Sequence, residues 1–434
     1  MVTGGTVVTM DDTRRVLTPG AVAIDGDSSV AVGTPEEVAA RFRAAETIDA
    51  TGQVVLPGLI NTHTHAAMVL YRGLGNDLNL QDWLTKYIFP AEARTVSPQF
   101  VRAGTRLAAL EMILGGTTTF VDMYYFEEEV AEATREAGLR GVLGQTVIQF
   151  PVPDARTPAE ALARSRAFIT RYKEDRLVTP AVAPHSMYAL AAADLQAADR
   201  LAREQGVPLL IHLEETKKEL EDARQAHGMS PTAYLASLNV LGPHVLGAHG
   251  VWVDPEDIRT LAAARVSVSH NPESNMKLAS GTAPLAAYVD AGVTLGLGTD
   301  GAASNNDLDM FEAMRQAAFL QKVVRNDPTA APASLVLDLA TRQGAKAIGM
   351  GDRLGQLTAG RRADVIIVDT TKPHLQPMFD PVAQIVYAAK ASDVRTTIVD
   401  GRILMHDRVV RTLEPGSVLA EARKMAERVR EAVK

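Results

Sequence analysis

The chain has 434 residues, of which 46% are hydrophobic and 22% charged, and its formal net charge is −8. That length suits one large domain with a smaller one, and the composition is that of a globular protein rather than a disordered one. The acidic balance, with no run of Lys and Arg, argues against nucleic acid as a partner. No stretch approaches the roughly 20 apolar residues of a membrane span, and no signal-peptide pattern opens the chain, so we expect a cytoplasmic protein without a membrane partner.

The sequence contains no cysteine. Disulfide bonds, thiolate metal ligands and a cysteine nucleophile are therefore excluded. Any metal ion must be bound by histidine and carboxylate side chains. The chain has ten histidines, which provide enough imidazoles for such a site.

The two ends of the chain share a pattern of short β-type runs and tight turns. Near the N-terminus, runs such as residues 6–9 alternate with Gly and Asp-Gly turns, which predicts a small antiparallel sheet. Near the C-terminus, residues 363–369 and 394–401 have the same character, and a charged segment of helical period closes the chain. We expect the two ends, residues 1–57 and 352–434, to build one small β-sandwich domain with a C-terminal helix.

Between the ends, apolar β-type runs alternate with segments of helical period, which is typical of βα units around a parallel sheet. Eight such runs closing on themselves would fill the roughly 250 residues of a (β/α)₈ barrel. We therefore expect an α/β fold, with a TIM-like barrel over residues 58–351 as the catalytic domain. The eight runs lie at residues 54–60, 117–123, 141–148, 178–183, 208–213, 244–248, 265–269 and 293–298.

Six of the ten histidines lie at or just past the C-terminal ends of these expected strands. Active sites of such barrels are built at that end, from residues that are remote in sequence. A single histidine there would more often be a buried structural residue, but six at one end of a barrel indicate a functional site. These residues are His63, His65, His185, His212, His249 and His270.

Four of the strand-end residues form a candidate ligand set for a metal ion. His63 and His65 are two residues apart in an extended segment, so their side chains project to the same side. His212 ends the fifth run and Asp300 follows the eighth, which completes three imidazoles and one carboxylate. This set suits Zn²⁺, although Fe²⁺, Co²⁺ or Mn²⁺ accept the same ligands. A bound ion would lower the pKa of water toward about 7 and so provide hydroxide at neutral pH.

Five segments around these residues resemble the amidohydrolase superfamily. They are Pro-Gly-Leu-Ile-Asn-Thr-His-Thr-His ending at His65, His-Leu-Glu-Glu-Thr from His212, Ala-His-Gly around His249, Ser-His-Asn-Pro around His270 and Gly-Thr-Asp ending at Asp300. Their order is similar to that in the branch that contains methylthioadenosine/S-adenosylhomocysteine deaminases, guanine deaminases and triazine hydrolases. The resemblance covers essentially the whole chain.

The resemblance implies a barrel with a small β-sandwich and a hydrolase that deaminates an adenosine-like nucleoside, releasing ammonia. It also implies a homo-oligomer. Members with two metals usually have a bridging lysine or glutamate after the fourth strand, where this chain has Pro184-His185-Ser186. Because a second dication would be poorly neutralised there, we expect one divalent ion per subunit and a substrate-binding role for His185.

Three residues have expected catalytic roles. Glu215 follows His212 by three residues and would give a proton to the ring nitrogen beside the amino-bearing carbon, unless it is a surface carboxylate. Asp300 would take the proton from the attacking water, and His249 would orient that water or the developing alkoxide. We also expect Glu215 and Asp300 to bind the substrate.

The resemblance also suggests how the nucleoside is selected. Glu92 lies in a long loop that we expect after the first strand, at about residues 66–92, and matches the acidic residue that binds ribose hydroxyls in the resembled deaminases. Arg156 matches an arginine that contacts an amino-acid tail, although an exposed surface arginine fits equally well. A second such arginine is replaced by Gln145, which lacks the charge for a bidentate pair with a carboxylate. Methylthioadenosine or adenosine is therefore favoured over S-adenosylhomocysteine.

Two other functions stay open on the sequence. The same site would also serve hydrolysis of another nitrogen heterocycle, such as deamination of a guanine or dechlorination of a triazine. A barrel without catalysis, acting as a scaffold, is the remote alternative, because the expected metal ligands are all present.

Overall fold

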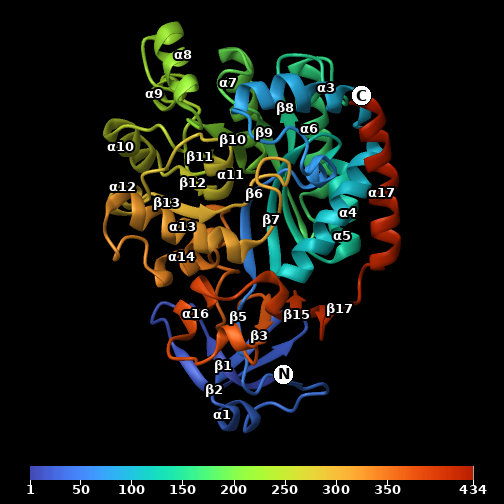
Figure 1. Cartoon of the computed structure of the whole chain (residues 1–434), viewed down its shortest axis with the longest axis vertical. Coiled ribbons are helices and arrows are strands. Elements are labelled where there is room, and N and C mark those ends of the chain that lie inside the picture. Colours follow the sequence, from blue (N-terminus) through green and yellow to red (C-terminus); the bar gives the residue numbers. More distant parts are fainter. Residues whose placement is uncertain (434) are drawn as a thin grey trace.

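A computed structural model describes residues 1–433 of the chain. Eight parallel strands stand in sequence order around a barrel, each hydrogen-bonded to the next, which confirms the predicted fold class (Figure 1). The last strand returns beside the first, where the backbone N–H of Asp300 donates to the carbonyl of His63 at 2.9 Å. The strands are β6 (Leu59–Thr64), β7 (Thr117–Tyr124), β8 (Arg140–Val147), β9 (Val178–Pro184), β10 (Leu209–Leu213), β11 (Val245–His249), β12 (Ser267–His270) and β13 (Thr294–Leu297).

The helices that cover the barrel are amphipathic. Because each has an apolar side, it can pack that side against the strands. Many begin at a capping side chain: Ser97, for example, accepts from the N–H of Phe100 at the start of α4 and Gly116 ends that helix in a left-handed conformation. No helix within residues 1–433 combines the length and apolar character needed to cross a membrane. The longer barrel helices are α4 (Pro98–Gly115), α5 (Glu127–Ala137), α6 (Pro158–Tyr172), α7 (Ala192–Gln205), α8 (Lys217–His227), α10 (Pro255–Ala264) and α13 (Met310–Arg325).

The two ends of the chain form a second, mixed sheet of nine strands. Strands from the two ends lie side by side in this sheet, because β14 (Val365–Val368) pairs antiparallel with β5 (Val54–Pro57). The order is β17-β16-β15-β14-β5-β1-β2-β3, with β4 beside β1. These strands are β1 (Val2–Val8), β2 (Val16–Asp25), β3 (Ser28–Gly33), β4 (Ile48–Asp49), β5 (Val54–Pro57), β14 (Val365–Val368), β15 (Val394–Val399), β16 (Arg402–His406) and β17 (Val409–Val410).

The expected first run of the barrel, residues 54–60, is divided between the two sheets. Its first half is β5 in the mixed sheet, and its second half begins the barrel strand β6. Gly58 lies between them, where a Cβ atom would come within 2.2 Å of the Thr118 side chain. The run is uniformly apolar because both halves are buried, so periodicity could not reveal the division.

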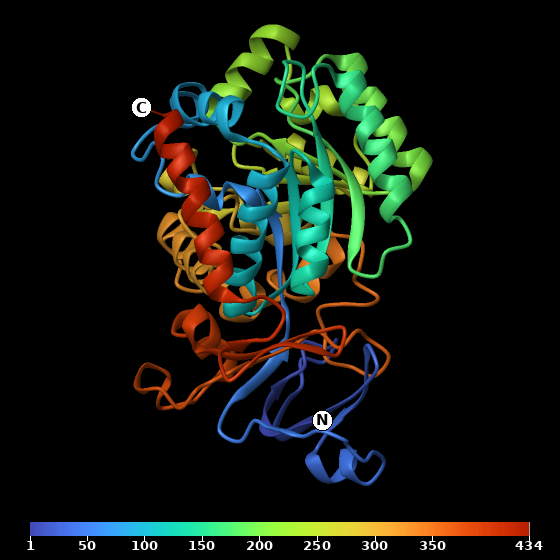
Figure 2. The ribbon, with the colours of Figure 1, turned by 90° about the vertical axis from the view of Figure 1, so that its right-hand side faces the viewer.

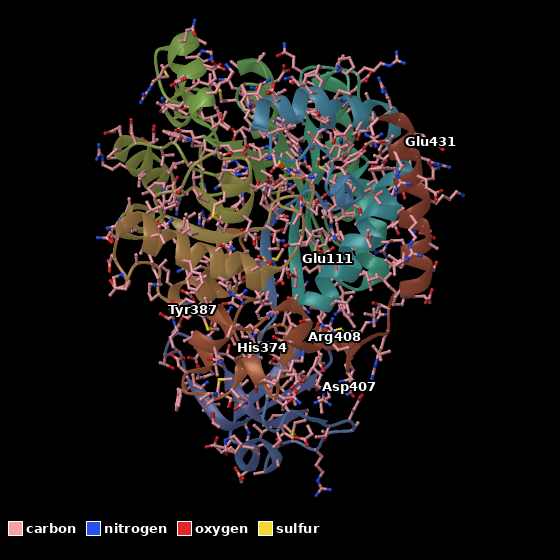
Figure 3. All side chains as sticks on the ribbon, in the orientation of Figure 1. Glu111, His374, Tyr387, Asp407, Arg408 and Glu431 are labelled. Carbon is pink, nitrogen blue, oxygen red and sulfur yellow. The ribbon has the colours of Figure 1, made fainter. Side chains whose placement is uncertain are left out.

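Buried and exposed side chains join the second sheet to the N-terminal ends of the barrel strands. Arg140, at the start of β8, pairs with Asp364 at 3.3 Å and with Asp400. Arg408, in the turn before β17, donates to the carbonyl of Leu114 at the end of α4 at 2.8 Å. Figure 3 shows Arg408 at the junction of the second sheet and the barrel. The C-terminal ends of the barrel strands therefore face away from the second sheet.

The C-terminal helix α17 (Pro415–Ala432) lies along the barrel (Figure 2). It packs against α4, and Glu421 on it pairs with Arg106 of α4. The division into residues 1–57 with 352–434 and residues 58–351 remains our proposal for the domain boundaries.

Candidate active site

A pocket lies at the C-terminal end of the barrel, where the sequence predicted a site. Strand-end residues form its floor, and residues from the segment after β6 form a wall. Its lining includes His65, His185, His212, Glu215, His249, Asp300, Glu92, Trp83, Phe89, Tyr124, Tyr125, Tyr188, Leu80, Leu84 and Leu278. The pocket is therefore largely apolar and aromatic, with a few polar groups on one side, as is usual for a small-molecule site.

Three of the four predicted metal ligands, His65, His212 and Asp300, line this pocket, and the buried His63 contacts Asp300 beside them. Oδ1 of Asp300 lies 3.4 Å from Nε2 of His63 and 3.3 Å from Nε2 of His65. Nε2 of His212 is 3.4 Å from Nε2 of His65. The donor atoms of His63, His65 and His212 lie within 4.8 Å of one another, as do those of His63, His249 and Asp300, and imidazoles with a carboxylate fit a divalent ion such as zinc.

Backbone carbonyls fix how two of these imidazoles face the pocket. Nδ1 of His65 lies 2.7 Å from the carbonyl of Met123, and Nδ1 of His212 lies 2.8 Å from the carbonyl of His185. With Nδ1–H donated to a carbonyl, each ring presents an unprotonated Nε2. Nε2 of His63 is buried without a hydrogen-bond partner in residues 1–433, which fits a ligand atom.

Burial favours the neutral form of His63, His185 and His212, and an imidazole that binds a metal must be neutral. Desolvation, with smaller effects from neighbouring imidazoles, lowers the pKa of His185 to about 3. Desolvation also lowers the pKa of His63 to about 4 and that of His212 well below its ordinary value. Burial alone would raise the pKa of Asp300, but His63, His65 and His249 together hold it well below its ordinary range.

Three donors hold the Asp300 carboxylate. Oδ2 accepts hydrogen bonds from the hydroxyls of Ser274 at 2.6 Å and Ser304 at 2.9 Å, and Oδ1 accepts from the N–H of Gly301 at 2.7 Å. Asp300 itself has a φ of 63°, in the left-handed region that a non-glycine residue adopts only when its surroundings enforce it. The carboxylate is therefore fixed before any ligand binds.

Glu215 and His249 face each other beside this cluster. Nε2 of His249 lies 3.8 Å from Oε2 of Glu215, and Nδ1 of His249 lies 2.9 Å from Oδ1 of Asn275. Burial raises the pKa of the Glu215 carboxyl, and His249 only partly opposes the rise. Burial would lower the pKa of His249, but Glu215 and Asp300 raise it above its ordinary value. A carboxyl and an imidazole with such shifted pKa values are suited to proton transfer.

The wall over the site is helical rather than an open loop. It comprises a 3₁₀ turn (Ala66–Tyr71), α2 (Leu80–Trp83), a π turn (Leu84–Ile88) and α3 (Phe89–Thr95). Glu92 of α3 lies inside the pocket and accepts from the Tyr124 hydroxyl at 2.7 Å. Desolvation raises the pKa of Glu92 to about 7, although the Tyr124 hydrogen bond partly offsets it.

The pocket gathers most of the predicted site residues but not all of them. His185 lines it, with its ring centroid 4.6 Å from that of His212. Arg156 is exposed and is not among the lining residues within 1–433. Gln145 is buried outside the pocket and donates to Oδ2 of Asp154 at 2.8 Å. Gln145 thus supports the loop after β8. The sequence alone assigned no role to Gln145.

Several polar residues that contact the predicted site were not proposed from the sequence. Asn275 and Ser274 belong to α11 (Pro272–Lys277), in a segment that resembles a loop near the substrate in the family but whose polar residues are equally typical of an ordinary turn. Ser280 donates to Oε1 of Glu215 at 3.3 Å. Short polar side chains of this kind have no distinctive spacing, so only the folded arrangement reveals them.

Imidazoles and a carboxylate gathered at the carboxyl ends of eight barrel strands define a metal-dependent hydrolase barrel. The chain belongs to the amidohydrolase family, because the profile of that family matches residues 54–404. Family membership and the donor set together indicate a divalent metal ion.

Relatives with known names cover the whole chain. A 5-methylthioadenosine/S-adenosylhomocysteine deaminase from Syntrophobacter fumaroxidans is 47% identical over 430 residues, 99% of this chain and 98% of that protein. An adenosine deaminase from Xanthomonas campestris with bound zinc superposes with a TM-score of 0.97 at 36% identity, covering 99% of this chain and 98% of that one. A zinc complex of an atrazine chlorohydrolase from Arthrobacter aurescens has a TM-score of 0.92 at 25% identity, covering 98% and 99%.

Proposed function

We propose that the chain is a hydrolytic deaminase of an adenosine-like nucleoside. The observation that carries this proposal is the position of Glu215, which lines the pocket beside His249 and the metal-ligand cluster. An acid there can protonate a ring nitrogen while water attacks the adjacent carbon. The names of the relatives support the same activity, since two of them are deaminases of adenine nucleosides.

We further propose that one zinc ion per subunit is held by His63, His65, His212 and Asp300. A divalent ion in this place supplies a water of lowered pKa as the nucleophile. The zinc bound in the adenosine deaminase of similar structure supports the choice of metal. His185, which offers no anionic side chain for a second dication, contacts the substrate instead.

Asp300, Glu215 and His249 have separate roles in the proposed reaction. Asp300 takes a proton from the attacking water as the oxygen of that water bonds to the amino-bearing carbon. Glu215, whose carboxyl pKa is raised by burial, gives a proton to the neighbouring ring nitrogen. His249 donates a hydrogen bond to the attacking oxygen. Asp300 passes the proton it took to the amino group, so the carbon–nitrogen bond breaks and ammonia leaves, and the remaining proton of the attacking oxygen returns to Glu215 as the carbonyl forms.

The lining of the pocket supports a neutral nucleoside as the substrate. Aromatic and aliphatic side chains such as Trp83 and Phe89 suit a purine base, and Glu92 can accept hydrogen bonds from ribose hydroxyls. No lysine or arginine is among the lining residues within 1–433. The carboxylate of an S-adenosylhomocysteine tail would therefore lack a cation, which favours adenosine and methylthioadenosine.

A second candidate substrate class is another aminated or chlorinated heterocycle. The atrazine chlorohydrolase shares the fold over nearly the full length at 25% identity, which keeps this class in consideration. Protonation by Glu215 would assist displacement from a triazine as well as from a purine. The product distinguishes the two, because a chlorotriazine releases chloride and an adenine nucleoside releases ammonia.

A substrate panel tests the proposed function. The zinc-loaded protein, incubated separately with adenosine, methylthioadenosine, S-adenosylhomocysteine, guanine and atrazine, is expected to release ammonia from the first two with the highest kcat/KM. For S-adenosylhomocysteine we expect kcat/KM lower by about 10-fold or more, since a charge-assisted hydrogen bond is worth about 1.5–3 kcal/mol. Ammonia release and adenine absorbance are the measurements.

The outcomes of the panel are distinct. Turnover of guanine or atrazine with none of the nucleosides would replace the proposed function by the heterocycle alternative. Arg156→Ala examines the predicted tail contact, because a fall in kcat/KM confined to S-adenosylhomocysteine would place Arg156 at the substrate. Equal losses for all three nucleosides would exclude that contact.

A further inference from the structure

The turn that carries Glu215 has a strained backbone. It joins β10 to α8, and within it Glu214 has a φ of 47°, in the left-handed region. Such a conformation costs on the order of 1–3 kcal/mol in a non-glycine residue and persists only when surrounding contacts enforce it. Both Glu214 and Glu215 are buried, so their backbone N–H groups also need acceptors.

One carboxylate accepts both of these N–H groups. Oε1 of Glu219 lies 3.2 Å from the backbone nitrogen of Glu214, and Oε2 lies 2.9 Å from that of Glu215. Glu219 is 5% exposed and belongs to the first turn of α8, where its own N–H donates to the Thr216 hydroxyl at 3.2 Å. The start of the helix therefore fixes the carboxylate against the turn.

Other contacts hold the side chain and the carbonyl of Glu214, whereas the Glu215 carboxylate has only long contacts. Oε1 of Glu214 accepts from the N–H of Thr232 at 3.0 Å, and its carbonyl accepts from the N–H of Val251 at 2.9 Å. The Glu215 carboxylate has a long hydrogen bond from Ser280, 3.3 Å, and His249 at 3.8 Å. Its direction into the pocket thus depends chiefly on the peptide that Glu219 holds.

We propose that Glu219 is a positioning residue, which directs the proton-donating carboxyl of Glu215 at the substrate by clamping two successive N–H groups. This inference rests on the proposed function, because it presumes the role of Glu215. Two carboxylate oxygens serve two N–H groups. A glutamine would serve one with its oxygen and oppose the other with its NH₂ group.

Two variants and one control test this role in the full-length, zinc-loaded protein. Glu219→Ala is expected to lower kcat for the best nucleoside about 10–100-fold, since a displacement of about 1 Å can cost 10²-fold. Glu219→Gln keeps one acceptor, so its kcat should lie between those of Glu219→Ala and the unaltered protein. KM and zinc content should change less than about twofold. Glu221→Gln, an exposed carboxylate on the same helix, is the matched control and should leave kcat unchanged.

A double-mutant cycle with Glu215→Gln separates positioning from mere support of the helix. If Glu219 acts through Glu215, then Glu219→Ala should slow the Glu215→Gln enzyme less than about twofold. An equal loss in both backgrounds would overturn the proposal. The proposal would also be overturned if Glu219→Gln had the same kcat per zinc-loaded molecule as Glu221→Gln and differed only in a lower melting temperature. If the unaltered protein deaminates no nucleoside, the proposed function fails instead, which is a different result.

Discussion

Replacing both His63 and His65 by alanine is expected to give a folded protein that is isolated without a divalent ion and does not deaminate nucleosides. Two of the four proposed ligands are lost, and the remaining imidazole and carboxylate are too few for a stable zinc site. Without the ion, the attacking water keeps its ordinary pKa, so we expect kcat to fall on the order of 10⁴-fold or more. Elemental analysis, circular dichroism and ammonia release measure the three effects.

The matched control for this pair is His227→Ala. His227 ends α8, is exposed and lies outside the pocket lining, so its loss should leave metal content and kcat unchanged. A double variant of His63 and His65 that keeps stoichiometric metal and full activity would remove these residues from the proposed site. A protein whose unaltered form binds no metal would support the scaffold alternative.

The second large effect is expected from Glu215→Gln. Glutamine has nearly the same shape and can keep the Ser280 hydrogen bond, but it cannot give a proton to a ring nitrogen. General acid–base catalysis contributes typically about 10²–10⁴-fold, so kcat should fall by that factor while zinc content stays the same. Steady-state kinetics and elemental analysis of the same sample measure both.

A result opposite to this is easily recognised. If Glu215→Gln deaminates adenosine within about twofold of the unaltered rate, the proton donor lies elsewhere. If it loses zinc instead, Glu215 supports the metal site rather than the substrate. Glu221→Gln is again the matched control, because it removes an exposed carboxylate of α8 that does not line the pocket.

The sequence predicted the barrel and the convergence at its C-terminal end because both follow from strong regularities. Strand-ending residues in parallel βα units must meet at one end, so His63, His212 and Asp300 could be brought together from their positions alone. The structure confirms the barrel, and the family profile confirms the resemblance. The assignment of individual ligands and catalytic residues stays a prediction, supported by their distances.

Features that depend on three-dimensional packing were not predicted. The helical wall after β6 lacks the length for periodicity to reveal it, because its pieces are four to seven residues long. Contacts from Asn275 and Ser304 come from short polar segments without a distinctive pattern. The carboxylate of Glu219 lies on a charged helix, where the sequence favours a solvated surface residue. Its 5% exposure appears only in the fold.

The central claim, hydrolytic deamination at a metal-dependent barrel site, is tested most directly by the fate of the attacking oxygen. The zinc-loaded protein should be incubated with adenosine in water enriched in heavy oxygen, and ammonia and the nucleoside product should be quantified by mass spectrometry. We predict one ammonia per adenosine consumed and one heavy oxygen atom in the base, at the carbon that lost its amino group. Unchanged adenosine, or a product without heavy oxygen in the base, would contradict the claim.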